Sequence, residues 1–198
     1  MYLYGAGGHG KVIKDILESQ GRDVEGFIDD NSNIIEISGL PVRHSMDGVD
    51  EVVVGIGINE TRKKVVEKIG CTFANAAIHK NAILSPTVQV GVGSVVMAGA
   101  IINVDTQIGK HCIINTGAVI EHECQIGDYV HISPHTTLCG NVTVGEGTWI
   151  GAGSTVIPGI TIGSWSQIGA GSVVVKDIPD GCLAYGNPCR IVKRRNKE

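Results

Sequence analysis

The chain has 198 residues, of which 42% are apolar and only 4% aromatic, with 28 glycines and a formal net charge of −4. This slightly acidic balance does not favour a nucleic-acid-binding protein. No apolar run approaches the ~20 residues that a membrane span needs, and no apolar leader opens the sequence, so membrane insertion is not expected.

The cysteines show no metal-binding or redox spacing. None of the six belongs to a CxxC pair, and two of them fall on small-residue positions of the repeat described below; they are Cys71, Cys112, Cys124, Cys139, Cys182 and Cys189. We expect reduced thiols that fill interior space rather than disulfides or zinc ligands, which favours a cytoplasmic protein.

A nucleotide-binding pattern opens the chain. A predicted strand at residues 2–4 leads into GAGGHG at 5–10, a helical pattern at 12–17, and a second strand at 24–28 that ends in Asp29 and Asp30. A third strand is predicted at 51–57 and a helix at 59–68. A glycine loop at a helix N-terminus offers N–H groups to a phosphate, and an acid at the next strand end accepts hydrogen bonds from sugar hydroxyls or a uracil N–H.

The same glycine spacing is also a fingerprint of NAD-binding domains. Only about 75 residues precede the repeat, half of what a two-lobed NAD-binding fold needs. We therefore favour a nucleotide sugar as the ligand of this loop over NAD, and over a tight turn that binds nothing.

An aliphatic residue occupies every sixth position from residue 84 to residue 174. The sixteen members are Leu84, Val90, Val96, Ile102, Ile108, Ile114, Ile120, Ile126, Ile132, Leu138, Val144, Ile150, Val156, Ile162, Ile168 and Val174. Helices repeat near 3.6 residues and strands near 2.0, so a strict period of six indicates a repeat solenoid. We predict a three-sided prism of short strands, with these rung residues inside, small residues two places earlier beside them, and 18 residues per coil.

Glycine often follows the rung directly, as at Gly91 and Gly109, where it relieves crowding or permits positive φ near a corner. Outward apolar residues at Val95, Ile101, Ile113 and Val119 predict lateral packing between subunits. After the last rung the period breaks, and we expect a cap that closes the open end of the solenoid.

One coil carries more chemistry than the others. His122 follows the rung Ile120 by two places, so its ring should project outward at a corner, between Glu121 and Glu123. An exposed imidazole beside carboxylates is suited to act as a general base. The residues one coil away, Val104 and Gly140, cannot ligate a metal, so no metal site is expected.

The repeats, such as IGKHC at 108–112 and IGDYV at 126–130, resemble those of the hexapeptide-repeat acyltransferases. Together, YGAGGHG, FIDD, GINETR and INTGAVIEHECQIG are similar to the sugar O- or N-acyltransferases of the sialic acid and bacillosamine pathways, most of all to the UDP-4-amino-sugar N-acetyltransferases. The resemblance implies an α/β, Rossmann-like nucleotide-sugar-binding domain at residues 1–75. It also implies a left-handed parallel β-helix of three hexads per coil, with a C-terminal cap, at residues 76–198.

The resemblance also assigns roles to residues. It implies that His122 is the general base, that Glu123 raises its basicity, and that Asn115 is a polar active-site residue. Acetyl-CoA would meet His131 at its thioester and the backbone at Gly140, Ala152 and Ala170. The sugar nucleotide would be held by Gly8, His9, Asp29, Gly57 and Arg62. Relatives of this kind are homotrimers with active sites between subunits.

The function expected from these features is acetyl-CoA-dependent N-acetylation of the 4-amino group of a UDP-linked amino-dideoxy sugar, by direct attack on the thioester without an acyl-enzyme. The product would be of the UDP-N,N′-diacetylbacillosamine type. O-acetylation of sialic acid or a related sugar is the alternative within the same class. An NAD-dependent oxidoreductase and a non-enzymatic solenoid binding module are the alternatives from other classes.

Overall fold

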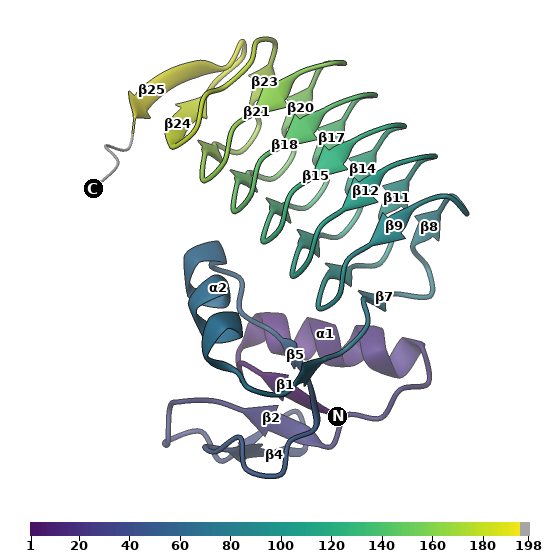
Figure 1. Cartoon of the computed structure of the whole chain (residues 1–198), viewed down its shortest axis with the longest axis vertical. Coiled ribbons are helices and arrows are strands. Elements are labelled where there is room, and N and C mark those ends of the chain that lie inside the picture. The colour runs from purple at the N-terminus through teal and green to yellow at the C-terminus, as the bar shows by residue number, and fades with distance from the viewer. Residues whose placement is uncertain (195–198) are drawn as a thin grey trace.

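The computed structural model describes residues 1–194. It consists of a small N-terminal α/β domain and a long parallel β-solenoid that rises from it (Figure 1). The predicted boundary at residue 75 falls between the last strand of the N-terminal sheet and the first strand of the solenoid. Residues 195–198 of the predicted second domain lie outside the described part of the chain.

The N-terminal domain is built on one six-stranded sheet in the order β3-β4-β2-β1-β5-β6. Its strands are β1 (Tyr2–Tyr4), β2 (Gly26–Ile28), β3 (Glu36–Ile37), β4 (Leu40–Arg43), β5 (Glu51–Val54) and β6 (Thr72–Phe73). Helices α1 (Gly8–Ser19) and α2 (Asn59–Lys68) lie between this sheet and the solenoid (Figure 1). Among the described residues, no helix is long and apolar enough to cross a bilayer.

The hairpin of β3 and β4 was not predicted from the sequence. It turns at Ser38 and Gly39, whose φ angles of 53° and 74° are both positive, as a tight two-residue hairpin requires. Strand β3 has only two residues, neither of them buried, so the segment carries no apolar alternation that would reveal it. The strand predicted at residues 2–4 is present with those bounds, whereas the other two predicted strands are shorter, because β2 begins at Gly26 and β5 ends at Val54.

The solenoid has three faces, each a parallel sheet in which a strand pairs with the strand 18 residues later, as in Val95 with Ile113. The first face contains β7 (Ala77–Ile78), β10 (Val95–Val96), β13 (Ile113–Ile114), β16 (His131–Ile132), β19 (Trp149–Ile150) and β22 (Gln167–Ile168). The second face contains β8 (Ile83–Leu84), β11 (Ile101–Ile102), β14 (Val119–Ile120), β17 (Thr137–Leu138), β20 (Thr155–Val156) and β23 (Val173–Val174). The third face contains β9 (Gln89–Val90), β12 (Gln107–Ile108), β15 (Gln125–Ile126), β18 (Thr143–Val144) and β21 (Thr161–Ile162). The cap consists of β24 (Cys182–Tyr185), which continues the first face, and β25 (Arg190–Arg194), which pairs with it in antiparallel fashion.

The predicted interior is confirmed. The rung is the second residue of each strand, and every rung from Val96 to Val174 is at most 4% exposed. The residue two places earlier is buried beside the rung, and where it is serine or threonine it joins successive coils through hydrogen bonds. The hydroxyl of Ser94, for example, donates to the carbonyl of Gly109 (2.8 Å) and accepts from the N–H of Cys112 (2.8 Å). Small polar residues suit this position because they satisfy backbone groups that the strands leave unpaired.

Glycine was expected to relieve crowding or to permit positive φ at the corners, and these two roles belong to different positions of the repeat. A Cβ on Gly109, directly after a rung, would lie 2.7 Å from the backbone nitrogen of Asp128 in the next coil, so glycine relieves crowding there. Positive φ occurs two residues further on, at one residue in every six, and glycine shares that position with residues such as Glu123 (60°) and Tyr129 (59°). The left-handed conformation therefore belongs to the corner itself, whichever residue occupies it.

The N-terminal domain covers the first coils of the first face. The outward side chains of Val95 and Ile113 belong to the same buried apolar cluster as Leu3, Ile13 and Phe27. The predicted packing of these two residues between subunits is therefore wrong, because a domain of the same chain buries them. On the second face, Ile101 and Val119 remain only partly buried.

Candidate functional site

The glycine loop between β1 and α1 contains glycines of two kinds. Gly5 and Gly10 are required by packing, because a Cβ on either would meet backbone atoms at 2.9 Å or less. Gly7 and Gly8 have open space where a side chain would be, and neither has a positive φ. Gly57, which lies after β5, is of the same kind. Since neither packing nor backbone conformation requires these three glycines, their surroundings fit the close approach of a ligand.

The start of α1 is open in the same way. Gly7 is the N-cap, no side chain caps the helix, and no acidic residue lies in its first turn. Asp29 fixes the loop from the neighbouring strand: its Oδ2 accepts a hydrogen bond from the N–H of Ala6 (2.7 Å), and its Oδ1 accepts from the N–H of Asn31 (2.9 Å). The free N–H groups and the helix dipole suit an anion such as a diphosphate.

Arg62 does not have the place that the resemblance implies. Its guanidinium is 1% exposed, and all five N–H donors bind protein acceptors. Nε donates to the carbonyl of His111 (2.8 Å), and Nη2 donates to the carbonyl of Tyr129 (2.8 Å) and to Asn59 Oδ1 (2.8 Å). Nη1 donates to the carbonyls of Ile56 (2.9 Å) and Gly57 (3.1 Å). No donor remains for a substrate, so we assign Arg62 to the joint between the two domains.

Asn59 extends this joint, and sequence reasoning did not identify it. Its Nδ2 donates to the carbonyl of Gly147 (3.1 Å). His111, Tyr129 and Gly147 occupy one corner position in three successive coils, because they are 18 residues apart and all have positive φ. Arg62 and Asn59 thus fix the start of α2 along a single corner of the solenoid.

His131 lies on the first face beside this joint, and Asn115 follows β13 where that face ends. The amide of Asn115 is oriented by its neighbour, because its Oδ1 accepts from the N–H of Thr116 (2.8 Å). Its Nδ2 therefore faces Nε2 of His131 (3.1 Å) and donates to it, which leaves the proton of the neutral imidazole on Nδ1. Trp149 stacks on His131, with ring centroids 5.4 Å apart and planes 3° from parallel. Sequence reasoning did not identify Trp149 as a neighbour of His131. The spacing of 18 residues, one full coil, could have indicated it.

Three imidazoles surround the Arg62 charge. Burial, followed by the charge of Arg62, lowers the pKa of His9 and of His111 to about 4. Burial, followed by the charges of Arg62 and His9, lowers the pKa of His131 to about 3. One ring nitrogen of each is buried without a hydrogen-bond partner within the described residues. All three imidazoles are therefore neutral near pH 7, and His131 is unsuited to be the base.

These depressed pKa values predict a loss of stability in mild acid. In the unfolded chain the three histidines take up protons near pH 6.5, whereas in the folded protein they do so only near pH 4 or below. The free energy of unfolding should be highest above pH 6.5 and should fall as the pH is lowered toward 4, by at most about 1.4 kcal/mol per pH unit for each imidazole.

Urea unfolding between pH 7 and pH 5 measures this slope. His9→Gln should make this slope shallower, because it removes one of the three depressed pKa values. A stability that does not vary with pH over this range would contradict the buried, neutral state of these rings.

His122 and Glu123 occupy the corner between the second and third faces, as predicted. The His122 side chain is 53% exposed, and its Nδ1 lies 2.9 Å from Oε2 of Glu123. An ionised carboxylate only accepts hydrogen bonds, so Nδ1 carries the proton and Nε2 presents a free lone pair. This is the arrangement that a general base requires.

The predicted site residues form two groups within one chain. Asn115 follows β13 at the corner between the first and second faces, and Ala152 and Ala170 follow β19 and β22 at that same corner in later coils. His122 and Gly140 follow β14 and β17 at the next corner. One face of the prism therefore separates His122 from Asn115 and His131, and a single chain does not bring them together.

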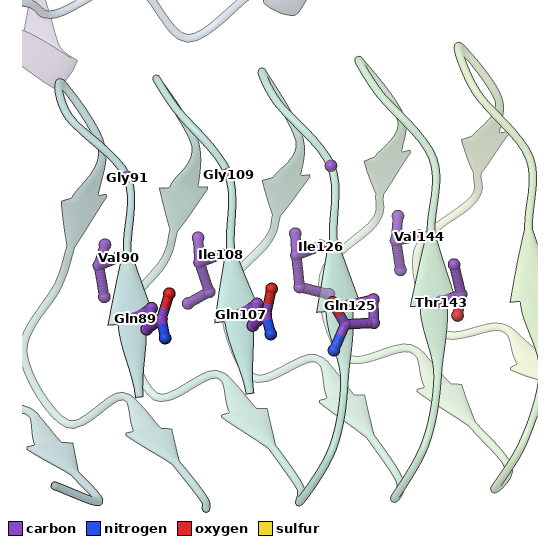
Figure 2. A pocket seen from close by; sticks show the side chains of 11 residues that line it. Gln89, Val90, Gly91, Gln107, Ile108, Gly109, Gln125, Ile126, Thr143 and Val144 are labelled. Carbon is purple, nitrogen blue, oxygen red and sulfur yellow. The ribbon is translucent and has the colours of Figure 1, made fainter. Parts of the chain in front are cut away.

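A groove on the third face lies apart from these residues. It has a volume of about 450 Å³ on the third face, where the side chains of Gln89, Gln107 and Gln125 repeat on consecutive strands (Figure 2). None of the predicted site residues and no titratable group lines it. Within residues 1–194, no group of three or more His, Cys, Asp or Glu side chains could hold a metal ion.

Comparisons with known proteins agree with this architecture. Residues 1–69 match the model of the PglD N-terminal domain, and residues 105–140 and 141–176 match that of the bacterial transferase hexapeptide repeats. The crystal structure of PerB from Caulobacter crescentus in complex with CoA and GDP-perosamine is 39% identical, with a TM-score of 0.91 over 97% of this chain and 96% of that chain. The acetyltransferase domain of PglB from Neisseria gonorrhoeae, in complex with acetyl coenzyme A, is 34% identical, with a TM-score of 0.87 over 96% and 98%.

Among curated proteins, the UDP-N-acetylbacillosamine N-acetyltransferase of Bacillus subtilis is 43% identical over 48% of this chain. The aligned part covers 50% of that protein, and 21% of another curated relative, protein L142 of Acanthamoeba polyphaga mimivirus. The PerB and PglB structures, by contrast, are matched over nearly their whole length, in both the N-terminal domain and the solenoid. The chain therefore belongs to the hexapeptide-repeat sugar acetyltransferases that carry a PglD-type N-terminal domain.

Proposed function

We propose that this protein transfers the acetyl group of acetyl-CoA to the 4-amino group of a UDP-linked amino-dideoxy sugar. The observation that carries the proposal is the exposed His122, whose Nδ1 is bound to Glu123 and whose Nε2 is free. The likeness to PerB, crystallised with CoA and GDP-perosamine, and to the Bacillus subtilis N-acetyltransferase supports an amino sugar as the acceptor.

The reaction needs a base because the amine must attack the thioester carbonyl as a neutral nucleophile. As the C–N bond forms, the amine proton passes to Nε2 of His122, and Glu123 stabilises the resulting imidazolium. The C–S bond then breaks, and the proton leaves with the CoA thiol. No cysteine is needed as a nucleophile; burial raises the pKa of Cys112 to about 12 and also raises that of Cys124.

The N-terminal domain would hold the nucleotide. The open glycines Gly7, Gly8 and Gly57 and the uncapped start of α1 fit a diphosphate, and Asp29 holds the loop in place. His9, in the first turn of α1, is also placed beside the nucleotide. The choice of uridine over guanosine is part of the proposal, since the PerB relative was crystallised with a GDP-sugar.

The two separated groups of site residues support an active site between subunits. In a closed ring of three chains, the corner with Asn115, His131, Ala152 and Ala170 of one chain would face the corner with His122, Glu123 and Gly140 of the next. The second face between these corners bears the partly buried Ile101 and Val119 and the exposed Ile83 (63%), which would line the centre of the ring. Acetyl-CoA would then run in the groove between the two corners. The six cysteines, all free thiols, support a cytoplasmic location.

Incubation with acetyl-CoA and candidate acceptors tests the proposal. Mass spectrometry should show one acetyl group added to a UDP-4-amino-6-deoxy sugar, and mild alkali should not remove it, because an amide survives where an ester is cleaved. A GDP-4-amino sugar and free sialic acid serve as competing acceptors. Alkali-labile acetylation of sialic acid would instead establish the O-acetyltransferase alternative.

Thermal unfolding separates the remaining alternatives. Acetyl-CoA at about 100 times its Kd should add about 2.7 kcal/mol to the free energy of unfolding. A solenoid that is only a binding module should gain nothing from acetyl-CoA, and an oxidoreductase should be stabilised by NAD instead. Either result would contradict the acetyltransferase function.

A further inference from the structure

Gly140 occupies a corner position where glycine is unusual. The corresponding residues in the neighbouring coils are Pro86, Val104, His122 and Pro158. The coils are aligned at this position, because the N–H that follows it donates to the carbonyl one coil earlier: Glu123 to Val104, Asn141 to His122 and Gly159 to Gly140. Proline, valine and histidine are thus all compatible with the backbone here, and Gly140 has no positive φ. Backbone conformation does not explain the glycine.

The imidazole of His122 explains it. A Cβ on Gly140 would lie 2.4 Å from both Cε1 and Nε2 of His122 and 3.1 Å from Cδ2. The ring therefore lies over Gly140, in the space that a side chain would fill. Since non-bonded carbon atoms are normally roughly 3.5–4.0 Å apart, an added methyl group would displace the ring by more than roughly 1 Å.

The direction of this contact sets it apart from similar ones. The rings of His111 and Trp165 also lie over glycines, Gly93 and Gly147, but these belong to the preceding coil and have positive φ of 70° and 66°. Those glycines have a conformational role as well. Gly140 belongs to the following coil and has no positive φ, and the three atoms nearest to its absent side chain all belong to the ring of His122.

We infer that Gly140 is a positioning residue for His122. It leaves room for the imidazole to rest on the next coil, with Nδ1 bound to Glu123 on one side and Nε2 held at a fixed place on the other. The inference rests on the proposed function, in which Nε2 of His122 is the base. The family resemblance implies only that the backbone of Gly140 contacts acetyl-CoA. The positioning role is additional, because it depends on the absence of a side chain at Gly140.

Gly140→Ala tests the inference in two independent ways. Without any substrate, ¹⁵N NMR of histidine-labelled protein should show His122 with its proton on Nδ1 in the wild type and a changed signal in Gly140→Ala; His122→Ala identifies the resonance. In turnover assays kcat should fall, by up to about 100-fold for a displacement of 1 Å, while the KM for acetyl-CoA stays nearly the same. Pro158→Ala, one coil later, is the matched control and should change neither.

A double variant guards against a simple folding defect. The change in unfolding midpoint caused by Gly140→Ala should be less favourable in the wild type than in the His122→Ala background, where the ring that the methyl group would strike is absent. An unchanged histidine signal, an unchanged kcat, or a raised KM for acetyl-CoA with normal kcat would each overturn the positioning role. If the wild type transfers no acetyl group to any amino sugar, the proposed function fails, whereas the NMR and stability measurements still decide the role of Gly140.

Discussion

His122→Ala is expected to lower kcat by roughly 10²–10⁴-fold, the usual contribution of a general base. Because the imidazole acts on a proton that moves only in the transition state, kcat and kcat/KM should fall together and the KM values should change little. Steady-state assays of thiol release, with the acetylated sugar confirmed by mass spectrometry, measure both parameters.

Glu123→Gln should reproduce part of this loss. The amide keeps the size of the side chain but removes the charge that stabilises the imidazolium, so the decrease in kcat should be smaller than that of His122→Ala. Val104→Ala and Asp105→Asn are matched controls, since these exposed residues occupy the positions of His122 and Glu123 one coil earlier. Near-normal turnover by His122→Ala would remove the proposed mechanism, even if the protein proved to be an acetyltransferase.

Arg62→Met is expected to destabilise the folded protein by at least about 3 kcal/mol, because it leaves several buried acceptors without a donor. For a chain of this size the unfolding midpoint should fall by roughly 6–12 °C. The physical reason is the joint between the domains, where one guanidinium binds the β5–α2 loop and two successive corners of the solenoid. Thermal unfolding at a fixed protein concentration measures the effect without any ligand.

Arg62→Lys shows whether the hydrogen bonds or the charge of Arg62 stabilise the folded protein, and Arg22→Met serves as the control. Arg62→Lys keeps the charge but cannot reproduce the planar set of five donors, so it should recover little of the lost stability. Arg22→Met removes a half-buried arginine whose contacts are long, at 3.5 Å to the carbonyl of Asn75 and 3.6 Å to the sulfur of Met1, and it should change stability by much less than Arg62→Met. A ligand-free Arg62→Met protein as stable as the wild type, but with weakened sugar binding, would instead support the substrate contact that the resemblance implies.

Much of the fold could be predicted because the repeat constrains every coil in the same way. Each rung must be aliphatic to fill the narrow interior, so the period of six, the strand positions and the outward direction of His122 all follow from the sequence. The β3–β4 hairpin was missed because β3 has only two residues, neither of them buried, and so leaves no apolar pattern. Val95 and Ile113 were misassigned because an outward apolar residue indicates a cover without revealing which part of the molecule supplies it.

The sequence by itself determined the solenoid, its rung residues and the exposed corner of His122, because these depend on neighbours six or 18 residues away in a regular repeat. Only the tertiary structure decided the role of Arg62, whose acceptors His111 and Tyr129 come from coils far along the chain. This role depends on how the N-terminal domain docks against the prism, and that docking is fixed by long-range packing and hydrogen bonds that no local pattern encodes.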